Sequence, residues 1–308
     1  MTTSTAATGA PDRIEQPVDL SLSGGHSHSR TVRDVVARVV MCLCFALAVL
    51  PLLWIVYTVL SNGLGLLLEV GWWNRSQAGL VSTIRGGGAY HAIVGTLLQA
   101  LVTASISVPV GVLVAIYLVE YGRGRLSTAV SFMVDVLTGV PSIVAALFVY
   151  ALWVGVFDLQ RVGFAVTLAL VLLMIPTVIR STEEMLKLVP NELREASYAL
   201  GVPKWKTIVS VVLPTAFNGI VTGVLLGLAR VMGETAPLLV LGPYTKFINL
   251  DLLASNMATL PTMINQERME ALAPAVERAW AAALTLILLV LMLNLVGRFI
   301  ARTGTVKA

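Results

Sequence analysis

The sequence predicts an all-α integral membrane protein with six transmembrane helices. Its 308 residues include only 21 Lys and Arg and 17 Asp and Glu, so 12% are charged, whereas a soluble domain carries about a quarter. Hydrophobic residues make up 57% of the chain, and the mean hydropathy is +0.86. A soluble core of this size could not bury so much apolar surface, which excludes a water-soluble enzyme.

Six apolar segments are long enough to cross a bilayer, which requires roughly 20 residues each. Proline falls inside three of them, at Pro109, Pro141 and Pro176, so we expect kinked helices in a bundle whose neighbours satisfy the freed carbonyls. Small and polar residues predict a disordered cytoplasmic tail over residues 1–33, followed by a transmembrane domain over residues 34–303. The predicted spans are Val35–Leu60, Ile93–Tyr121, Ala129–Phe157, Val162–Ile179, Ala216–Leu241 and Ala279–Ile300.

The distribution of Lys and Arg predicts the orientation. With the N-terminus inside, fourteen of the 21 lie on the cytoplasmic side and six outside, and Arg230 falls within a span. Because cytoplasmic loops carry the excess of Lys and Arg, we predict a multi-pass protein of the plasma (inner) membrane with both termini cytoplasmic. Trp72 and Trp73 are expected to anchor the chain at the outer interface. Neither a nucleic-acid partner nor a metal site is predicted.

The predicted cytoplasmic loop over residues 181–213 contains a short helix of its own. Pro190 can begin this helix, because its missing N–H costs nothing in the first turn, and Gly201 can end it. Leu193, Ala196 and Leu200 share one face by their i, i+3, i+7 spacing. The pattern leaves two interpretations open, a helix that lies on membrane lipid and one that docks on another protein.

The same loop resembles the EAA loop of ABC-importer permeases. Glu195-Ala196-Ser197 is followed by three residues, Gly201, nine residues and then Val211-Val212-Leu213-Pro214. The departures from the family pattern are small: Ser197 replaces an alanine and Val211 an isoleucine. The resemblance implies a coupling helix that docks on a cytoplasmic ATPase through Glu195, Ala196, Gly201, Leu213 and Pro214.

Hydrolysis of ATP is expected in another polypeptide. The chain has no GxxxxGK[ST] loop to hold phosphates, so it is predicted to be a non-catalytic permease subunit. It would need no cofactor of its own, because the partner ATPase would bind ATP and Mg.

The resemblance extends over about residues 93–300 and narrows to the phosphate-specific branch. It is carried by Gly111–Tyr121, Thr138–Val144 and Arg230–Thr235, and the chain is most similar to the A-type permeases of that branch. It implies phosphate import beside a homologous C-type permease, two ATPase subunits and an extracytoplasmic phosphate-binding protein. Two alternatives are an ABC permease for sulfate or molybdate and an ion-coupled secondary transporter. The second would call for internal repeats, and the halves of the sequence show none.

The fifth predicted span carries the candidate pathway residues. Three glycines recur every four residues, and Arg230 and Glu234 continue their face within an arc of about 80°. Small residues let another helix approach, and membrane-buried ions usually face a bundle interior or a watery cavity. The pair could be a salt bridge that only stabilises packing. Alternatively, Arg230 could offer its planar donors to an anion, while Glu234 holds the guanidinium in place or competes with the anion for it. The resemblance favours a pathway through Arg230, Glu234 and Thr235, with helix packing assigned to Gly219, Gly223 and Gly227.

Asp135, in the third predicted span, is the other intramembrane acid. An ion pair with Arg180, near the inner end of the fourth span, is favoured over contact with substrate, because a lone carboxylate would repel phosphate. Gly139 and Pro141 mark a predicted backbone bend beyond it, whose freed groups could face the pathway.

Overall fold

The computed structural model describes residues 28–303, and over this range the chain is helical with no β-strand. It separates into two compact units, Met1–Trp54 and Ile55–Ala308. Residues 1–27 of the predicted tail lie outside the described range. In chain order the elements are α1 (His28–Leu67), α2 (Val70–Asn74), α3 (Tyr90–Ile116), η1 (Tyr117–Tyr121), α4 (Arg125–Thr138), α5 (Ser142–Tyr150), η2 (Ala151–Val156), α6 (Gly163–Lys187), α7 (Asn191–Ala199), α8 (Lys204–Thr207), η3 (Ile208–Val212), α9 (Leu213–Met232), α10 (Ala236–Leu241), α11 (Leu260–Met269) and α12 (Ala273–Thr303), where η marks a π-helical turn.

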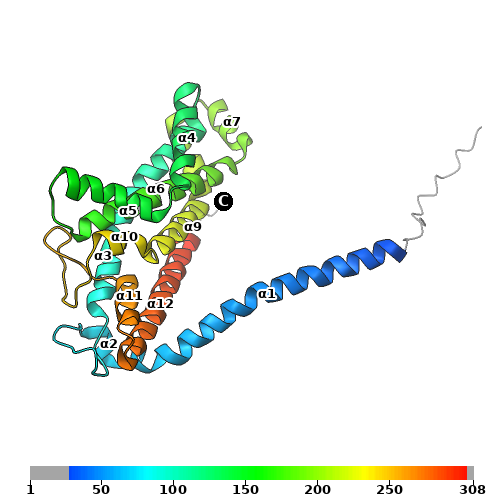
Figure 1. The fold of residues 1–308 in the computed structure, drawn as a ribbon. Coiled ribbons are helices and arrows are strands. Elements are labelled where there is room, and N and C mark those ends of the chain that lie inside the picture. Colours follow the sequence, from blue (N-terminus) through cyan, green and yellow to red (C-terminus); the bar gives the residue numbers. More distant parts are fainter. Residues whose placement is uncertain (1–27, 304–308) are drawn as a thin grey trace, which may run out of the picture. The chain divides into compact units, whose positions relative to one another are not determined.

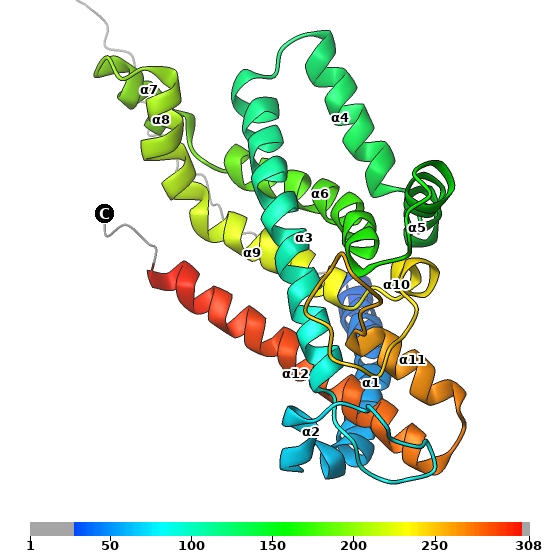
Figure 2. The same ribbon diagram turned by 90° about the vertical axis from the view of Figure 1, so that its left-hand side faces the viewer.

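Within the second unit, α6 packs between α3 and α9, and α12 packs on α9 (Figures 1 and 2). The core side chains of α6 include Val166, Leu170 and Met174, and they pack against Val231 of α9 and Leu238 of α10. Hydrophobic length dictates these helices, because backbone polar groups in a bilayer must be satisfied within the chain.

The number of spans agrees with the prediction. Five helices are long and apolar enough to cross a membrane, and the bent pair of α4 with α5 and η2 makes a sixth when it is counted as one span. The two prolines expected to kink the second and fourth spans, Pro109 and Pro176, lie inside α3 and α6 without ending them.

The third predicted span, Ala129–Phe157, is not one helix. α4 ends at Thr138, and after a break at Gly139–Pro141 the chain resumes as α5 in a direction 102° away. Pro141 lacks an N–H and restricts Val140 to non-helical conformations. The bend expected at Gly139 and Pro141 is therefore present, and it is much sharper than a kink.

The bent helix pair α4–α5 nevertheless runs from one end of the bundle to the other. At one end, Arg194 on α7 donates to Glu120 in η1, the π-helical turn that continues α3, and to the Leu186 carbonyl in the last turn of α6, so these two membrane helices end on the same side. At the other end, the Phe164 N–H at the start of α6 donates to a carbonyl of the loop 242–259 at 2.8 Å, and a Cβ on Gly95 of α3 would collide with the same loop. Because α3 ends at one side and α6 begins at the other, α4 and α5 together make one crossing.

The fifth predicted span, Ala216–Leu241, is also interrupted. α9 ends at Met232, residues 233–235 leave the helix, and α10 begins at Ala236. At its other end, α9 continues backward through η3 and α8 to Lys204. The apolar run reads as one span because Gly233, Glu234 and Thr235 are too few to interrupt its mean hydropathy.

Trp72 was wrongly predicted to be an interface anchor. It is fully buried in α2, and its indole N–H donates to Thr285 Oγ1 on α12 at 2.9 Å. Trp73 is 45% exposed and donates to the Leu67 carbonyl. A buried indole needs a hydrogen-bond partner, and the hydroxyl that satisfies Trp72 lies 213 residues away in the sequence.

A buried ion pair organises the end of the bundle around α11, a helix that hydropathy did not predict. Arg278 and Glu267 are both fully buried, with Nε and Oε2 at 2.8 Å, and Arg278 also donates to the Ser82 and Ile84 carbonyls. Nearby, burial raises the pKa of the Tyr244 hydroxyl above its usual value. One guanidinium thus holds α11, α12 and the loop before α3 together.

Candidate functional site

Arg230 and Glu234 face each other across the end of α9. Arg230 Nε lies 3.7 Å from Glu234 Oε1, which is longer than a hydrogen bond, and the side chains are 62% and 17% exposed. In the described part of the chain, the Arg230 guanidinium makes no hydrogen bond. The pair is therefore loose, and most donors of this arginine are open to another group.

The helix α9 ends beside this pair. The Gly233 N–H donates to the Arg230 carbonyl at 3.1 Å and the Glu234 N–H to the Val231 carbonyl at 3.1 Å, so α9 closes with a tight last turn. Thr235 then stands at the N-cap of α10. The three candidate pathway residues therefore surround one helix break, which is the kind of irregular backbone that membrane proteins keep where it lines a cavity or is buried in protein.

The glycines of α9 lie against α6. A Cβ on Gly219 would come 2.2 Å from Met185 Sδ, and one on Gly223 would come 2.5 Å from the Ser181 side chain. A Cβ on Gly227 would be 3.5 Å from Thr177, an ordinary contact. Two of the three glycines therefore permit a closer approach of α9 to α6 than any larger residue would.

The predicted coupling loop contains α7. A glycine, Gly201, ends this helix. Gly201 has φ +74°, its N–H donates to the Tyr198 carbonyl at 2.9 Å, and the Val202 N–H donates to the Ser197 carbonyl at 3.2 Å. This bond pattern is a Schellman motif, whose left-handed residue is usually glycine. Pro190 precedes α7 as its N-cap.

The predicted docking residues divide between two places. Glu195 and Ala196 are exposed on α7, together with Leu193 and Leu200. Leu213 and Pro214 instead open α9, where they line an apolar groove of about 690 Å³ with residues of α3 and α12. The structure therefore does not bring the two halves of the loop motif to one surface.

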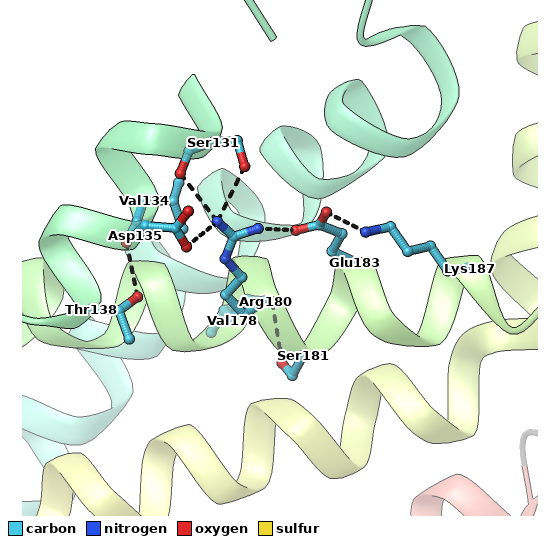
Figure 3. A network of polar contacts seen from close by, with 9 residues as sticks. All are labelled: Ser131, Val134, Asp135, Thr138, Val178, Arg180, Ser181, Glu183 and Lys187. Carbon is cyan, nitrogen blue, oxygen red and sulfur yellow. Dashed lines mark hydrogen bonds and ion pairs between the residues drawn. The ribbon is translucent and has the colours of Figure 1, made fainter. Parts of the chain in front are cut away.

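Asp135 and Arg180 form the predicted ion pair (Figure 3). Arg180 Nη2 also contacts the Ser131 carbonyl and hydroxyl at 3.1 and 3.2 Å, and its Nη1 lies 2.5 Å from Glu183. Glu183 in turn accepts from Lys187 at 2.7 Å. Arg180 therefore joins α6 to α4 within a chain of alternating charges, and the sequence indicated only its first link.

A family model supplies the identification. Residues 107–303 match the binding-protein-dependent transport system inner membrane component. The chain belongs to this family. The match covers every helix from the second half of α3 to α12, so the loop motif and the α9–α10 break both lie within the permease domain.

Individual relatives match nearly the whole chain. It is 50% identical over 294 residues to the phosphate transport system permease protein PstA 1 of Mycobacterium tuberculosis H37Rv, covering 96% of both chains. It is 49% identical over 293 residues to the corresponding permease of Mycobacterium leprae, covering 94% of this chain and 96% of the relative. The permease of Yersinia pestis is 39% identical over 273 residues, with coverages of 88% and 90%. The resemblance to the A-type permeases is confirmed, and this permease is a non-catalytic, multi-pass subunit of the inner membrane.

Solved structures share the fold. The MetNI methionine ABC transporter in an inward-facing conformation superposes with a TM-score of 0.55 at 20% identity, over 71% of this chain and 94% of that chain. A bacterial alginate ABC transporter gives a TM-score of 0.58 at 15% identity, over 86% and 95%. The expected ABC-importer permease architecture is therefore confirmed.

The sequence missed a second cationic contact at the coupling loop. Arg194 on α7 contacts Glu120 on η1, with the Glu120 side chain buried and that of Arg194 largely so, and Lys204 lies over the Tyr121 ring at 4.8 Å. The sequence shows only an acid, Glu120, at the end of the second predicted span and two cations, Arg194 and Lys204, in the loop 181–213. Nothing in a single sequence pairs residues that are 74 positions apart.

Proposed function

We propose that this chain is a transmembrane subunit of an ATP-driven importer that moves inorganic phosphate into the cell and forms half of the translocation pathway. The observation that carries the proposal is the 50% identity, over 96% of the chain, with a phosphate transport permease. Arg230 supports it further, because an exposed guanidinium at a broken membrane helix suits an oxyanion.

The proposed role of Arg230 is to contact the passing anion. A guanidinium presents planar, permanently charged donors that match a tetrahedral oxyanion's oxygens in pairs. Glu234, at 3.7 Å, would orient Arg230 and compete with the anion for it. This competition would keep binding weak enough for release, and Thr235 would add a hydroxyl at the same break.

The exposed face of α7 supports the proposed ATPase partner, and membership of the permease family supports the other proposed partners. Leu193, Ala196 and Leu200 lie at the surface of this chain, as expected for a coupling helix that inserts into a groove of an ATPase. A homologous C-type permease would complete the pathway, and two ATPase subunits would bind ATP and Mg. An extracytoplasmic phosphate-binding protein would deliver the anion on the opposite side.

Reconstitution tests this function. The complex with its partners is placed in proteoliposomes, and uptake of radiolabelled phosphate is measured with internal ATP, and then without ATP under an imposed proton or sodium gradient. Uptake that requires ATP and resists excess sulfate and molybdate is expected. Uptake driven by a gradient alone would support a secondary transporter instead, and stronger competition by sulfate or molybdate would reassign the anion.

The proposed orientation places both termini and the loop 181–213 in the cytoplasm. It is supported by the fourteen-to-six division of Lys and Arg. Single cysteines at Lys204 and Lys246, in a background without Cys42 and Cys44, test it with an impermeant external reagent. Labelling at position 246 alone is expected, and labelling at position 204 would contradict the orientation.

A further inference from the structure

Arg194 ties the coupling helix α7 to two membrane helices at once. Its Nε and Nη2 donate to Glu120 Oε1, in the η1 turn that continues α3, at 3.1 and 3.0 Å. Its Nη1 and Nη2 also donate to the Val189 and Leu186 carbonyls at 2.6 and 2.9 Å, at the end of α6. The Arg194 and Glu120 side chains are only 13% and 5% exposed. One side chain therefore fixes α7 against the ends of α3 and α6.

Lys204 holds the same turn from the other side of the loop. Its Nζ donates to the Glu120 carbonyl and lies 4.8 Å from the centre of the Tyr121 ring, a distance suited to a cation–π contact. The buried hydroxyls of Ser197 and Thr207, 2.8 Å apart, join α7 to α8. A hydrogen bond thus joins α7 to α8, and two cations of this segment, Arg194 and Lys204, contact η1.

Separating α7 from α3 would be costly. Buried ion pairs contribute little net stability, but breaking one by removing a partner is strongly destabilising, because a charge is left buried without compensation. Moving α7 alone would leave the Glu120 carboxylate in that condition. The low-energy response to a displaced α7 is therefore for the end of α3 to move with it.

A second connection from α7 is covalent. α8, η3 and α9 form one continuous run from Lys204 to Met232, about 40 Å long at 1.5 Å per residue, which ends at the Arg230–Glu234 break. A push on the coupling loop would reach that break through α9 whether or not Glu120 is present. The contact with Glu120 adds something different, because it recruits α3, which packs along α6.

We propose that Glu120 and Arg194 are positioning residues that pass movement of the coupling helix to α3, so that ATP hydrolysis displaces α3 and α9 together. This inference rests on the proposed docking of α7 on an ATPase. With the contact broken, the ATPase would still dock and hydrolyse ATP. Lys204 would still bind the Glu120 carbonyl, but α3 would follow α9 less completely, and the pathway would open only in part in each cycle.

The test measures ATP hydrolysed per phosphate imported in proteoliposomes holding the whole complex, with both rates divided by the amount of assembled complex. Glu120→Gln keeps the size of the side chain and removes its charge. Arg194→Lys keeps the charge and loses the planar fork. Each is expected to raise the ratio at least about fivefold, the low end of coupling free energies between sites. Glu184→Gln, which changes an exposed carboxylate at the end of α6, is the matched control and should leave the ratio unchanged.

The double variant makes the test specific to this contact. Because both changes break the same interaction, their combined effect should not exceed that of either alone. Additive effects would overturn the proposal, as would an unchanged ratio in both single variants. Failure of both variants to assemble would also overturn it, because the pair would then serve folding. If the unmodified complex itself lacks ATP-dependent phosphate uptake, the proposed function fails, and that result is distinguishable from the others.

Discussion

The Asp135 carboxylate on α4 lies against the Arg180 guanidinium on α6, and the same guanidinium also contacts Glu183 one turn further along α6. Arg180 is therefore shared by two acids and by the Ser131 carbonyl. The acids differ in environment, because the side chain of Asp135 is 66% exposed and that of Glu183 only 11%. The arrangement supports a structural role for Asp135. Loss of Arg180 should cost more folding stability than loss of Asp135.

The two ends of this pair should differ in their effect on stability. Asp135→Asn removes an exposed charge, and its cost should be below about 1 kcal/mol. Arg180→Ala leaves the buried Glu183 with Lys187 alone, and its cost should approach about 3 kcal/mol. Thermal unfolding of the detergent-solubilised complex measures both. Equal shifts in Tm for the two variants would contradict this ranking.

Gly201 should respond to backbone conformation rather than to side-chain size. Its φ is +74°, and a Cβ built there would have nothing within 4 Å, so the cost of a substitution is conformational. Gly201→Val should cost about 1–2 kcal/mol and displace the end of α7, so the purified complex should retain less ATPase. Gly201→Asn is the matched control, because asparagine adopts the left-handed conformation readily. Equal ATPase content in both variants would exclude a role for this turn in docking.

The approach of α9 to α6 predicts a compensating pair of substitutions. Gly223→Ala would place a methyl group 2.5 Å from the Ser181 side chain, and the strain should lower the amount of assembled complex by a cost of roughly 1–3 kcal/mol. Adding Ser181→Gly should restore part of it. Gly155→Ala, at a position with nothing within 4 Å, controls for the methyl group itself. Quantitative immunoblotting of membranes measures the unmodified protein and the three variants, and no recovery in the double variant would refute the contact.

Much of the fold could be predicted from hydropathy, because a bilayer demands long apolar helices whatever their packing. The Arg230–Glu234 and Gly201 features were also predictable, since each depends on residues a few positions apart. The bend between α4 and α5 was foreseen at Pro141 but not its angle of 102°, which depends on what the two pieces pack against.

Contacts between distant parts of the chain could not be predicted. Trp72 was placed at the interface because the sequence does not show Thr285 beside it. Likewise, the Glu120–Arg194 pair joins residues from separate helices. The non-helical residues 233–235 were missed for a different reason. In any window of span length, the apolar residues on both sides outweigh one glutamate in the mean hydropathy.

Uptake of phosphate per assembled complex, measured for Arg230 variants in the same proteoliposomes, tests the central claim most directly. Arg230→Ala should lower uptake roughly ten- to a hundredfold, the range expected for losing hydrogen bonds to a charged group. Arg230→Lys should retain assembly but lose much of the uptake, because lysine lacks the planar fork. Glu234→Gln should reduce assembly less than Arg230→Ala does, because it removes an anion rather than leaving one unpaired. Normal uptake per assembled Arg230→Ala complex would contradict a pathway role for this residue and leave the ion pair as a packing contact.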